Sequence, residues 1–513
     1  MGLLCTLFLA AAAQNYDAIL LTENASPYSD YASAIAISGD WAFVGAPDDQ
    51  INGTNYIGSV LVYQKTANGW IESQKLLASD GQLFHTFGHS LAADGNRLVV
   101  GAPDALGNSI GAAYIFEYNG SQWIETQKVA QTTGYGDDWF GWSVDIEGDR
   151  VVVGAMYSHY PGLSWSRSHA GSGWIFDYDG AQWNLTQEIS ASDKDFYDLF
   201  GASIALDGDK VLVGARGEGD DIGGGIIEGY KGAAYVFQLN AGTWVETQKL
   251  IGSTREEHAW FGNALDIKGN HLLVGSPGKN GGGIYGSGVV YAFRFSAGSW
   301  NETAILKSPL ELSTRTFGQA IAMENDFAVI AAAGYDFLGN DTGAVHPWRR
   351  YGNEWIPEPA INPGTLHTWD GFARDVDLDG SAMLTCAYLE HLPAKYAPGA
   401  GFIYDLSPRF HLIVPQLPFD IAEDAKMEIR FATPNSLAWL AYSLTGPGST
   451  PIPPLGVVLD LANPKQLGNP VQTDASGYAK WEMAVPISAQ GLTVWLQAVQ
   501  AGQTTNLIRS TIR

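Results

Sequence analysis

The chain has 513 residues, with 28 Lys and Arg against 54 Asp and Glu, and a formal net charge of −26. A surface of that sign repels phosphate backbones, which excludes nucleic acid as an expected partner. Two cysteines are too few for a disulfide-stapled scaffold, and after the first residues no apolar run is long enough to cross a bilayer, so we expect no transmembrane segment. The length predicts more than one domain.

Residues 1–13 read as a signal peptide, because an apolar run ends in the small residues Ala10 to Ala13. We expect cleavage near Gln14 and a protein that is secreted, extracellular or held at the cell surface. No Lys or Arg precedes the run, and Cys5 lies too near the start to favour a lipoprotein. The mature chain then keeps only Cys386. It falls where the repeat described below has small residues, so we expect a buried structural thiol rather than a catalytic one.

One complete copy of a repeated unit spans Phe87 to Val129. It opens on Phe87-Gly88, turns at Asp94-Gly95 and runs into Gly101-Ala102-Pro103. A polar loop follows, and then a second apolar run, the turn Asn119-Gly120 and a last strand that opens on Trp123. Asp-Gly and Asn-Gly accept the positive φ that tight hairpin turns demand. One unit therefore predicts two hairpins, or four short strands.

The unit occurs seven times, at a spacing typical of propellers and solenoids. Its Phe-Gly pair returns, in full or in weaker form, at Tyr31, Phe140, Phe200, Phe261, Phe317 and Phe372. A fourth strand that opens on Trp occurs only six times, at Trp70, Trp123, Trp183, Trp244, Trp300 and Trp355. The last copy ends at Tyr404 without one, and Ala18 to Leu21 precede the first copy as Lys75 to Leu77 precede Phe87.

These counts predict an all-β fold, a seven-bladed β-propeller over residues 14–410 that the N-terminal strand closes. Closing a ring of four-stranded sheets hides the faces that a lone sheet exposes. The Phe-Gly and Gly-Ala-Pro elements resemble the FG-GAP repeat family, which builds the propeller of integrin α subunits and of many secreted bacterial proteins. The resemblance covers roughly Ala18 to Phe410 and implies the fold. It does not imply one activity, because such a fold hosts unrelated functions.

The repeat stops after Phe410, and residues 411–513 predict a small β-sandwich domain, because short strand-like runs alternate there with turns. This part holds seven acids and six bases, so the acidity of the chain belongs to the propeller. The domain looks like one appended to many secreted bacterial proteins. A spacer, a folding aid and a surface attachment all stay open as its role.

The loops between second and third strands, and the connections between repeats, share one end of the propeller and are long and varied. Binding residues ride on variable loops held by a rigid scaffold, so we place the ligand-binding face there. Aromatic rings supply contact area for a glycan or peptide, and carboxylates supply orientation. The candidate residues on this acidic face are Trp139, Tyr157, His159, Tyr160, Trp165, Arg167, His169, Asp220, Asp221, Trp260 and Trp369. The alternative for Trp139, Trp260 and Trp369, which come just before Phe-Gly, and also for Trp165, is packing between neighbouring blades.

Catalytic signatures are absent from the sequence. Asp375 to Gly380 reads Asp-x-Asp-x-Asp-Gly, the opening of a calcium loop, but its last two residues fall on the hairpin turn of the repeat, and the later ligand positions hold Met383 and Cys386. We therefore expect no cofactor and no metal, with calcium the less favoured alternative. The sequence predicts a non-catalytic, monomeric binding protein for an extracellular protein or glycan. A polysaccharide-active enzyme using loop carboxylates, and a structural envelope or matrix component, are the alternatives.

Overall fold

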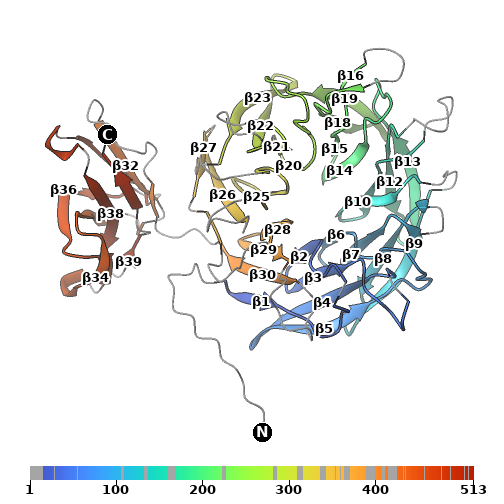
Figure 1. The fold of residues 1–513 in the computed structure, drawn as a ribbon, viewed down its shortest axis with the longest axis horizontal. Helices are drawn as coiled ribbons and strands as arrows, with labels where there is room; N and C mark the ends of the chain where they lie inside the picture. Colours follow the sequence, from blue (N-terminus) through green and yellow to red (C-terminus); the bar gives the residue numbers. More distant parts are fainter. Residues whose placement is uncertain are drawn as a thin grey trace, which may run out of the picture. The chain divides into compact units, whose positions relative to one another are not determined.

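A computed structural model describes residues 16–512 except 28, 55, 106–108, 132–136, 160–168, 222–226, 281–285, 309–315, 335–342, 353, 359, 363–369, 389–398, 407–410, 414–423, 431, 434, 456, 475–476, 486, 491, 502 and 506–507. The chain divides into two compact units, Met1–Asp405 and Leu406–Arg513. Each unit is nearly all β-structure (Figure 1).

The first unit consists of seven four-stranded antiparallel sheets, arranged as blades around a centre (Figure 1). Sheets one to three contain β2 (Ile35–Ser38), β3 (Trp41–Ala46), β4 (Ser59–Thr66) and β5 (Gly69–Leu76); β6 (Ser90–Asp94), β7 (Arg97–Ala102), β8 (Ala112–Tyr118) and β9 (Trp123–Val129); and β10 (Phe140–Glu147), β11 (Arg150–Ala155), β12 (Ser172–Tyr178) and β13 (Trp183–Ile189).

Sheets four to six contain β14 (Phe200–Asp207), β15 (Lys210–Ala215), β18 (Ala233–Asn240) and β19 (Thr243–Leu250); β20 (Leu265–Lys268), β21 (His271–Ser276), β22 (Val289–Ser296) and β23 (Ser299–Leu306); and β24 (Ile321–Glu324), β25 (Phe327–Ala332), β26 (Ala344–Tyr351) and β27 (Glu354–Pro357). A small hairpin of β16 (Asp220–Asp221) and β17 (Ile227–Glu228) extends the loop between β15 and β18.

The seventh sheet joins the two ends of this unit. It contains β28 (Val376–Asp379), β29 (Ala382–Ala387), β30 (Ala400–Asp405) and the N-terminal strand β1 (Ala18–Leu20), which pairs antiparallel with β30 through Ala18 and Ile403. The innermost strands β2, β6, β10, β14, β20, β24 and β28 each contact the next, and β28 contacts β2. The strand pairing therefore agrees with a seven-sheet ring that the N-terminal strand completes. The predicted signal peptide lies outside the described residues.

The repeat motif is explained by one close backbone contact between neighbouring sheets. A Cβ added at Gly101, in the Gly-Ala-Pro element, would lie 2.1 Å from the carbonyl oxygen of Gly141, in the Phe-Gly pair of the next sheet. Gly141 itself has a φ of +93°, which glycine adopts without strain. The preceding Phe140 is fully buried, and its backbone N–H donates to the Ile110 carbonyl at 3.0 Å. The two elements of the motif thus fasten one sheet to the next.

The outer strands are joined by a recurring glutamine. The side-chain amide of Gln127 in β9 donates to the carbonyl oxygen of Trp183 in β13 at 2.7 Å and accepts from the Trp183 N–H at 2.7 Å. Equivalent pairs join Gln74 to Trp123, Gln187 to Trp244 and Gln248 to Trp300. The glutamine that recurs in these fourth strands therefore contributes to the contacts between sheets.

The second unit contains two larger sheets and a hairpin. One sheet is β31 (His411–Ile413), β32 (Asp424–Arg430) and β37 (Ala479–Ala484); the other is β36 (Lys465–Gln472), β33 (Leu437–Ser443), β38 (Thr493–Gln500), β39 (Gln503–Thr504) and β40 (Ile508–Thr511); the hairpin is β34 (Pro447–Ile452) and β35 (Val457–Leu461), and the short helices are η2 (Pro453–Leu455) and η3 (Ile487–Ala489). Met427 and Trp481 from the first sheet share a core with Leu440 and Leu496 from the second. This is the β-sandwich arrangement.

Two further observations concern the whole described chain. Among the described residues, no helix has the length and apolar character needed to span a bilayer. Cys386 is buried as expected, and burial raises the pKa of its thiol to about 12.

Candidate functional site

One end of the propeller carries exposed aromatic side chains. In an antiparallel sheet of four strands, the loop from the second to the third strand and the connection to the next sheet lie at the same end. We call this end the loop face. The exposed aromatic side chains of the described propeller residues all belong to it: Tyr56, Phe84, Tyr230 and Trp260. Phe84 is 57% exposed and stacks on Tyr56 with ring centroids 5.4 Å apart.

A continuous row of rings crosses the loop face near the third sheet. We call His89, Trp142, Trp139, Tyr157, His169 and Tyr197 the aromatic row, because each ring contacts the next at centroid distances of 4.4 to 5.1 Å. Trp139 and Trp142 are nearly parallel, at 19°. The bulge between Phe140 and Ser143 in β10 helps to bring them together, since a bulge re-aims side chains at the end of a strand.

His159 is held beside this row by a buried carboxylate. Its Nδ1 lies 2.8 Å from Asp138 Oδ1, and its backbone N–H donates to the same oxygen at 3.0 Å. The side-chain amide of Gln131 donates to the other Asp138 oxygen at 2.8 Å. Because the His159 ring also contacts His169 edge-on at 5.4 Å, Asp138 orients both the loop and the row. Burial lowers the pKa of His169, and neighbouring His159 lowers it further.

The backbone that presents these rings is unusual. Trp139 and Trp260, directly before Phe-Gly, have φ values of +57° and +54°, and His258 has +57°. Non-glycine residues seldom adopt this left-handed region, but the residue before Phe-Gly does so in other sheets as well: Thr86, Leu199 and Thr316 have φ values of +51°, +59° and +62°. The conformation is therefore a feature of the repeat. Each conformation is fixed by the loop opposite: the Trp260 N–H donates to the Tyr230 carbonyl at 3.1 Å, and the Trp139 N–H donates to the Ser109 carbonyl at 3.0 Å.

A pocket of about 450 Å³ opens on the loop face between the fourth and fifth sheets. We call it the Arg216 pocket; its lining residues are Leu199, Arg216, Tyr230, His258, Trp260 and Asn263. The Tyr230 and His258 rings stack at 5.9 Å and 28°. Arg216 donates to Asn263 Oδ1 at 3.2 Å, and its guanidinium carbon lies 6.0 Å from the centroid of Trp142. The pocket is therefore next to the aromatic row.

The structure brings some of the predicted residues together and separates others. Trp139, Tyr157, His159 and His169 form one cluster, in or beside the aromatic row. Trp260 lies apart from them in the Arg216 pocket and is 41% exposed, so it is not enclosed between blades. Asp220 and Asp221 form β16, whose side chains are not described. The remaining candidates, Tyr160, Trp165, Arg167 and Trp369, lie outside the described residues.

Several residues of this region were not predicted from the sequence. Trp142 was missed because a strand residue gave no sign that a bulge would redirect it. Arg216 carried a signal that could have been used: it occupies the place of the proline in Gly-Ala-Pro, where other copies have Pro47, Pro103 and Pro277 and the preceding copy has Met156. The other copies named here have an apolar residue at this position, so a cation there is an exception within the repeat.

The Asp-x-Asp-x-Asp-Gly segment forms hydrogen bonds between the seventh sheet and the first. Asp375 and Asp377 in or beside β28 accept hydrogen bonds from the backbone N–H groups of Ile35 and Ile37 in β2, at 3.2 and 2.7 Å, and Asp379 accepts one from Gly39. All three carboxylates are thus engaged by the first sheet. In the part of the chain that the structure describes, no group of three or more His, Cys, Asp or Glu side chains could hold a metal ion.

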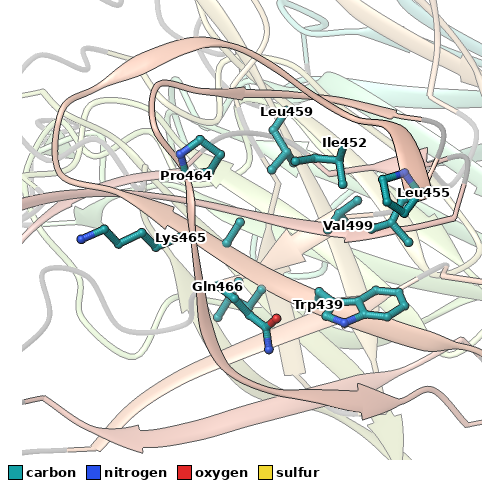
Figure 2. A pocket seen from close by; sticks show the side chains of 11 residues that line it. Trp439, Ile452, Leu455, Leu459, Pro464, Lys465, Gln466 and Val499 are labelled. Carbon is teal, nitrogen blue, oxygen red and sulfur yellow. The ribbon is translucent and has the colours of Figure 1, made fainter.

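The second unit has an apolar pocket of its own. It has a volume of about 340 Å³ and lies between the hairpin β34–β35 and the sheet that contains β33 and β36 (Figure 2). Trp439, Leu455 and Leu459 line it, with Lys465 and Gln466 at its polar side. Leu459 and Val499 also belong to the core beneath the hairpin, so the pocket is an opening in that core.

The comparisons agree with the repeat architecture. The model of the FG-GAP repeat matches four segments of the chain, residues 70–116, 123–176, 183–237 and 244–293. Each match starts at the Trp of a fourth strand and ends in the third strand of the following sheet, so it includes the contact between two neighbouring sheets. A comparison with curated proteins finds no match to this chain.

Proposed function

From the four FG-GAP repeats that the chain carries, we propose that it is a secreted, non-catalytic binding protein whose loop face holds an extracellular glycan or protein. Residues 1–13 would direct export, and the C-terminal sandwich would serve as a spacer or anchor. The proposal covers the aromatic row and the Arg216 pocket as one extended surface.

One observation carries this proposal. The aromatic side chains that the described propeller leaves exposed, Tyr56, Phe84, Tyr230 and Trp260, all lie on the loop face. Exposed aliphatic residues are spread more widely. Ile71, Ile124 and Val245 lie on fourth strands, where alternation along an outer strand accounts for them, whereas Leu77, Leu83 and Ile251 lie on connections between sheets. Solvent-exposed aromatic side chains offer a large contact area to a ligand and lose little conformational entropy on binding, so they are suited to a binding surface.

Binding can be tested with the mature chain on a glycan array and with a pull-down from extracellular material. We expect retention of an intact ligand, with Trp260→Ala and Phe84→Ala each weakening it at least about tenfold, as truncation of a central aromatic anchor does. Ile71→Ala and Val245→Ala remove exposed apolar area elsewhere on the propeller and serve as matched controls. Equal loss in the controls would contradict the choice of face, and cleavage of the retained glycan would contradict a non-catalytic role.

A further inference from the structure

Arg216 is a cation for which the described residues of this strongly acidic protein supply no anionic partner. Within the described part of the chain, no carboxylate lies within 4.0 Å of its guanidinium, whose contacts are Asn263 Oδ1 at 3.2 Å and Met156 Sδ at 4.0 Å. Other propeller arginines do pair with carboxylates: Arg97, Arg150, Arg255, Arg349, Arg350 and Arg374. Among the described residues, Arg216 differs in this respect from these six arginines.

The surroundings of Arg216 make this arrangement costly without a ligand. Burial lowers the pKa of the guanidinium, an effect that the attraction of Tyr157 only partly offsets. Asn263 positions the guanidinium on one side. Its side-chain oxygen accepts from Arg216, and its amide nitrogen donates to the Gln319 carbonyl at 3.2 Å, which fixes the orientation of the amide. A fixed, partly desolvated guanidinium that retains free N–H groups is suited to bidentate binding of a carboxylate.

The remaining walls of the pocket point to a ring-shaped ligand. Trp260 is 41% exposed and Tyr230 is 37% exposed, so both rings are open to a partner. A volume of about 450 Å³ lies in the range of small-molecule sites, roughly 300–1,000 Å³, and is ample for one sugar unit. Aromatic rings offer flat apolar contact to the faces of a sugar, whereas an extended acidic side chain would leave them uncovered.

We propose that the Arg216 pocket binds a hexuronate unit of a glycan, with Arg216 on the carboxylate and Trp260 and Tyr230 against the ring. This deepens the proposed function and rests on it. The net charge of −26 further selects the ligand, because a polyanion would be repelled as a whole. The geometry therefore fits isolated uronates within an otherwise neutral chain of sugars.

The test compares three probes by calorimetry or ligand-observed NMR: methyl β-glucuronide, its methyl ester, and methyl β-glucoside. The full mature chain should bind the acid at least tenfold more tightly than either neutral probe. Arg216→Met should reduce that ratio to about one without unfolding the chain, because Met156 occupies the same repeat position in the preceding sheet. Arg216→Lys should retain a smaller preference, since Lys keeps the charge but not the bidentate geometry.

Arg294→Met is the matched control. Arg294 is an exposed residue of β22 whose neighbour across the strand pair, His271, begins β21 at the end opposite to the loop face. This variant removes the same charge and should leave the ratio unchanged. An unmodified chain that does not prefer the acid over its ester overturns the proposal, as does an N-acetylglutamate amide that binds as tightly as the glucuronide, because recognition would then need no sugar ring. Retention of neutral glycans through Trp260 would meanwhile still support the loop face as a binding surface.

Discussion

At the scale of single residues, the glycines of the repeat matter because they have no Cβ and so allow another backbone to approach closely. Gly101 gives room to the carbonyl of Gly141, and the contact recurs between Gly154 and Gly201 at 2.2 Å and between Gly214 and Gly262 at 2.0 Å. In these three pairs a Cβ at the first glycine would overlap the facing backbone oxygen, although the φ of this position does not demand glycine. The sixth and seventh sheets, with Ala331 and Cys386 at the same position, do not have this glycine.

Gly101→Ala should therefore lower the free energy of unfolding by at least about 3 kcal/mol or prevent folding, because its Cβ would overlap a backbone oxygen that cannot move alone. Gly95→Ala is the control. Gly95 has a φ of +58° in a turn with open space around it, so its replacement should cost only about 1 kcal/mol. Chemical denaturation of both variants measures the difference, and equal costs would refute the steric explanation.

Buried aspartates also join neighbouring sheets. Asp145 Oδ1 and Oδ2 accept from the N–H groups of Ile146, at 2.8 Å, and Leu206 of the next sheet, at 2.7 Å. Burial raises the pKa of Asp145 to about 7 and that of Asp377 to about 7, despite these hydrogen bonds. Between about pH 4 and pH 7 the folded chain thus keeps protons that the unfolded chain releases, so the free energy of unfolding falls as pH rises.

Asp145→Asn should flatten this pH dependence. For one such carboxyl, the slope is at most about 1.4 kcal/mol per pH unit, and the variant should lose most of that contribution between pH 5 and pH 7. Urea titrations at several pH values measure the slope for the unmodified chain and for the variant. The two slopes are compared, and not the absolute free energies of unfolding, because the substitution also replaces one acceptor oxygen by an amide nitrogen. An unaltered slope in Asp145→Asn would contradict the assignment.

At the scale of strands, the glutamine side chains join the fourth strands of neighbouring sheets by hydrogen bonds. Gln127→Ala removes both hydrogen bonds to the Trp183 backbone and should lower the free energy of unfolding by about 1–3 kcal/mol, since a part-buried N–H and C=O lose their partner. Gln182→Ala, an identical substitution at an exposed residue of the adjoining turn, should cost less than about 0.5 kcal/mol. Thermal unfolding of the two variants tests the contrast.

The strands could largely be predicted from the sequence, whereas the candidate site could be predicted only in part. Turns such as Asp94-Gly95 and alternating runs that begin at Trp123 report local conformation directly, so repetition made the strand pattern readable. The aromatic row depends on a bulge in β10 and on left-handed residues between sheets, which join rings from four separate segments. Neither feature has a local sequence signature, and therefore Trp142 and Arg216 were missed.

At the scale of the whole molecule, the ring depends on β1. Leu20 is fully buried in the core that the seventh and first sheets share, whereas the adjacent Ile19 is 38% exposed. Leu20→Asp should lower the free energy of unfolding by several kcal/mol, because it buries an unpaired charge, and should therefore lower the melting temperature strongly. Ile19→Asp should have little effect on either quantity. Similar melting temperatures for both variants would show that β1 is dispensable.

The pairing of β1 with β30 also affects the order in which the propeller folds. The backbone N–H of Asp405 donates to the side chain of Asp17, a contact between residues 388 positions apart. A ribosome delivers the amino end first, so that segment must wait, unpaired, until nearly the entire propeller has been synthesised. The six intervening sheets can form earlier from contacts near in sequence, and the final docking brings the largest loop-closure penalty. Maturation of this protein should therefore end in one late event, before which the incomplete circle presents a vacant sheet edge to chaperones.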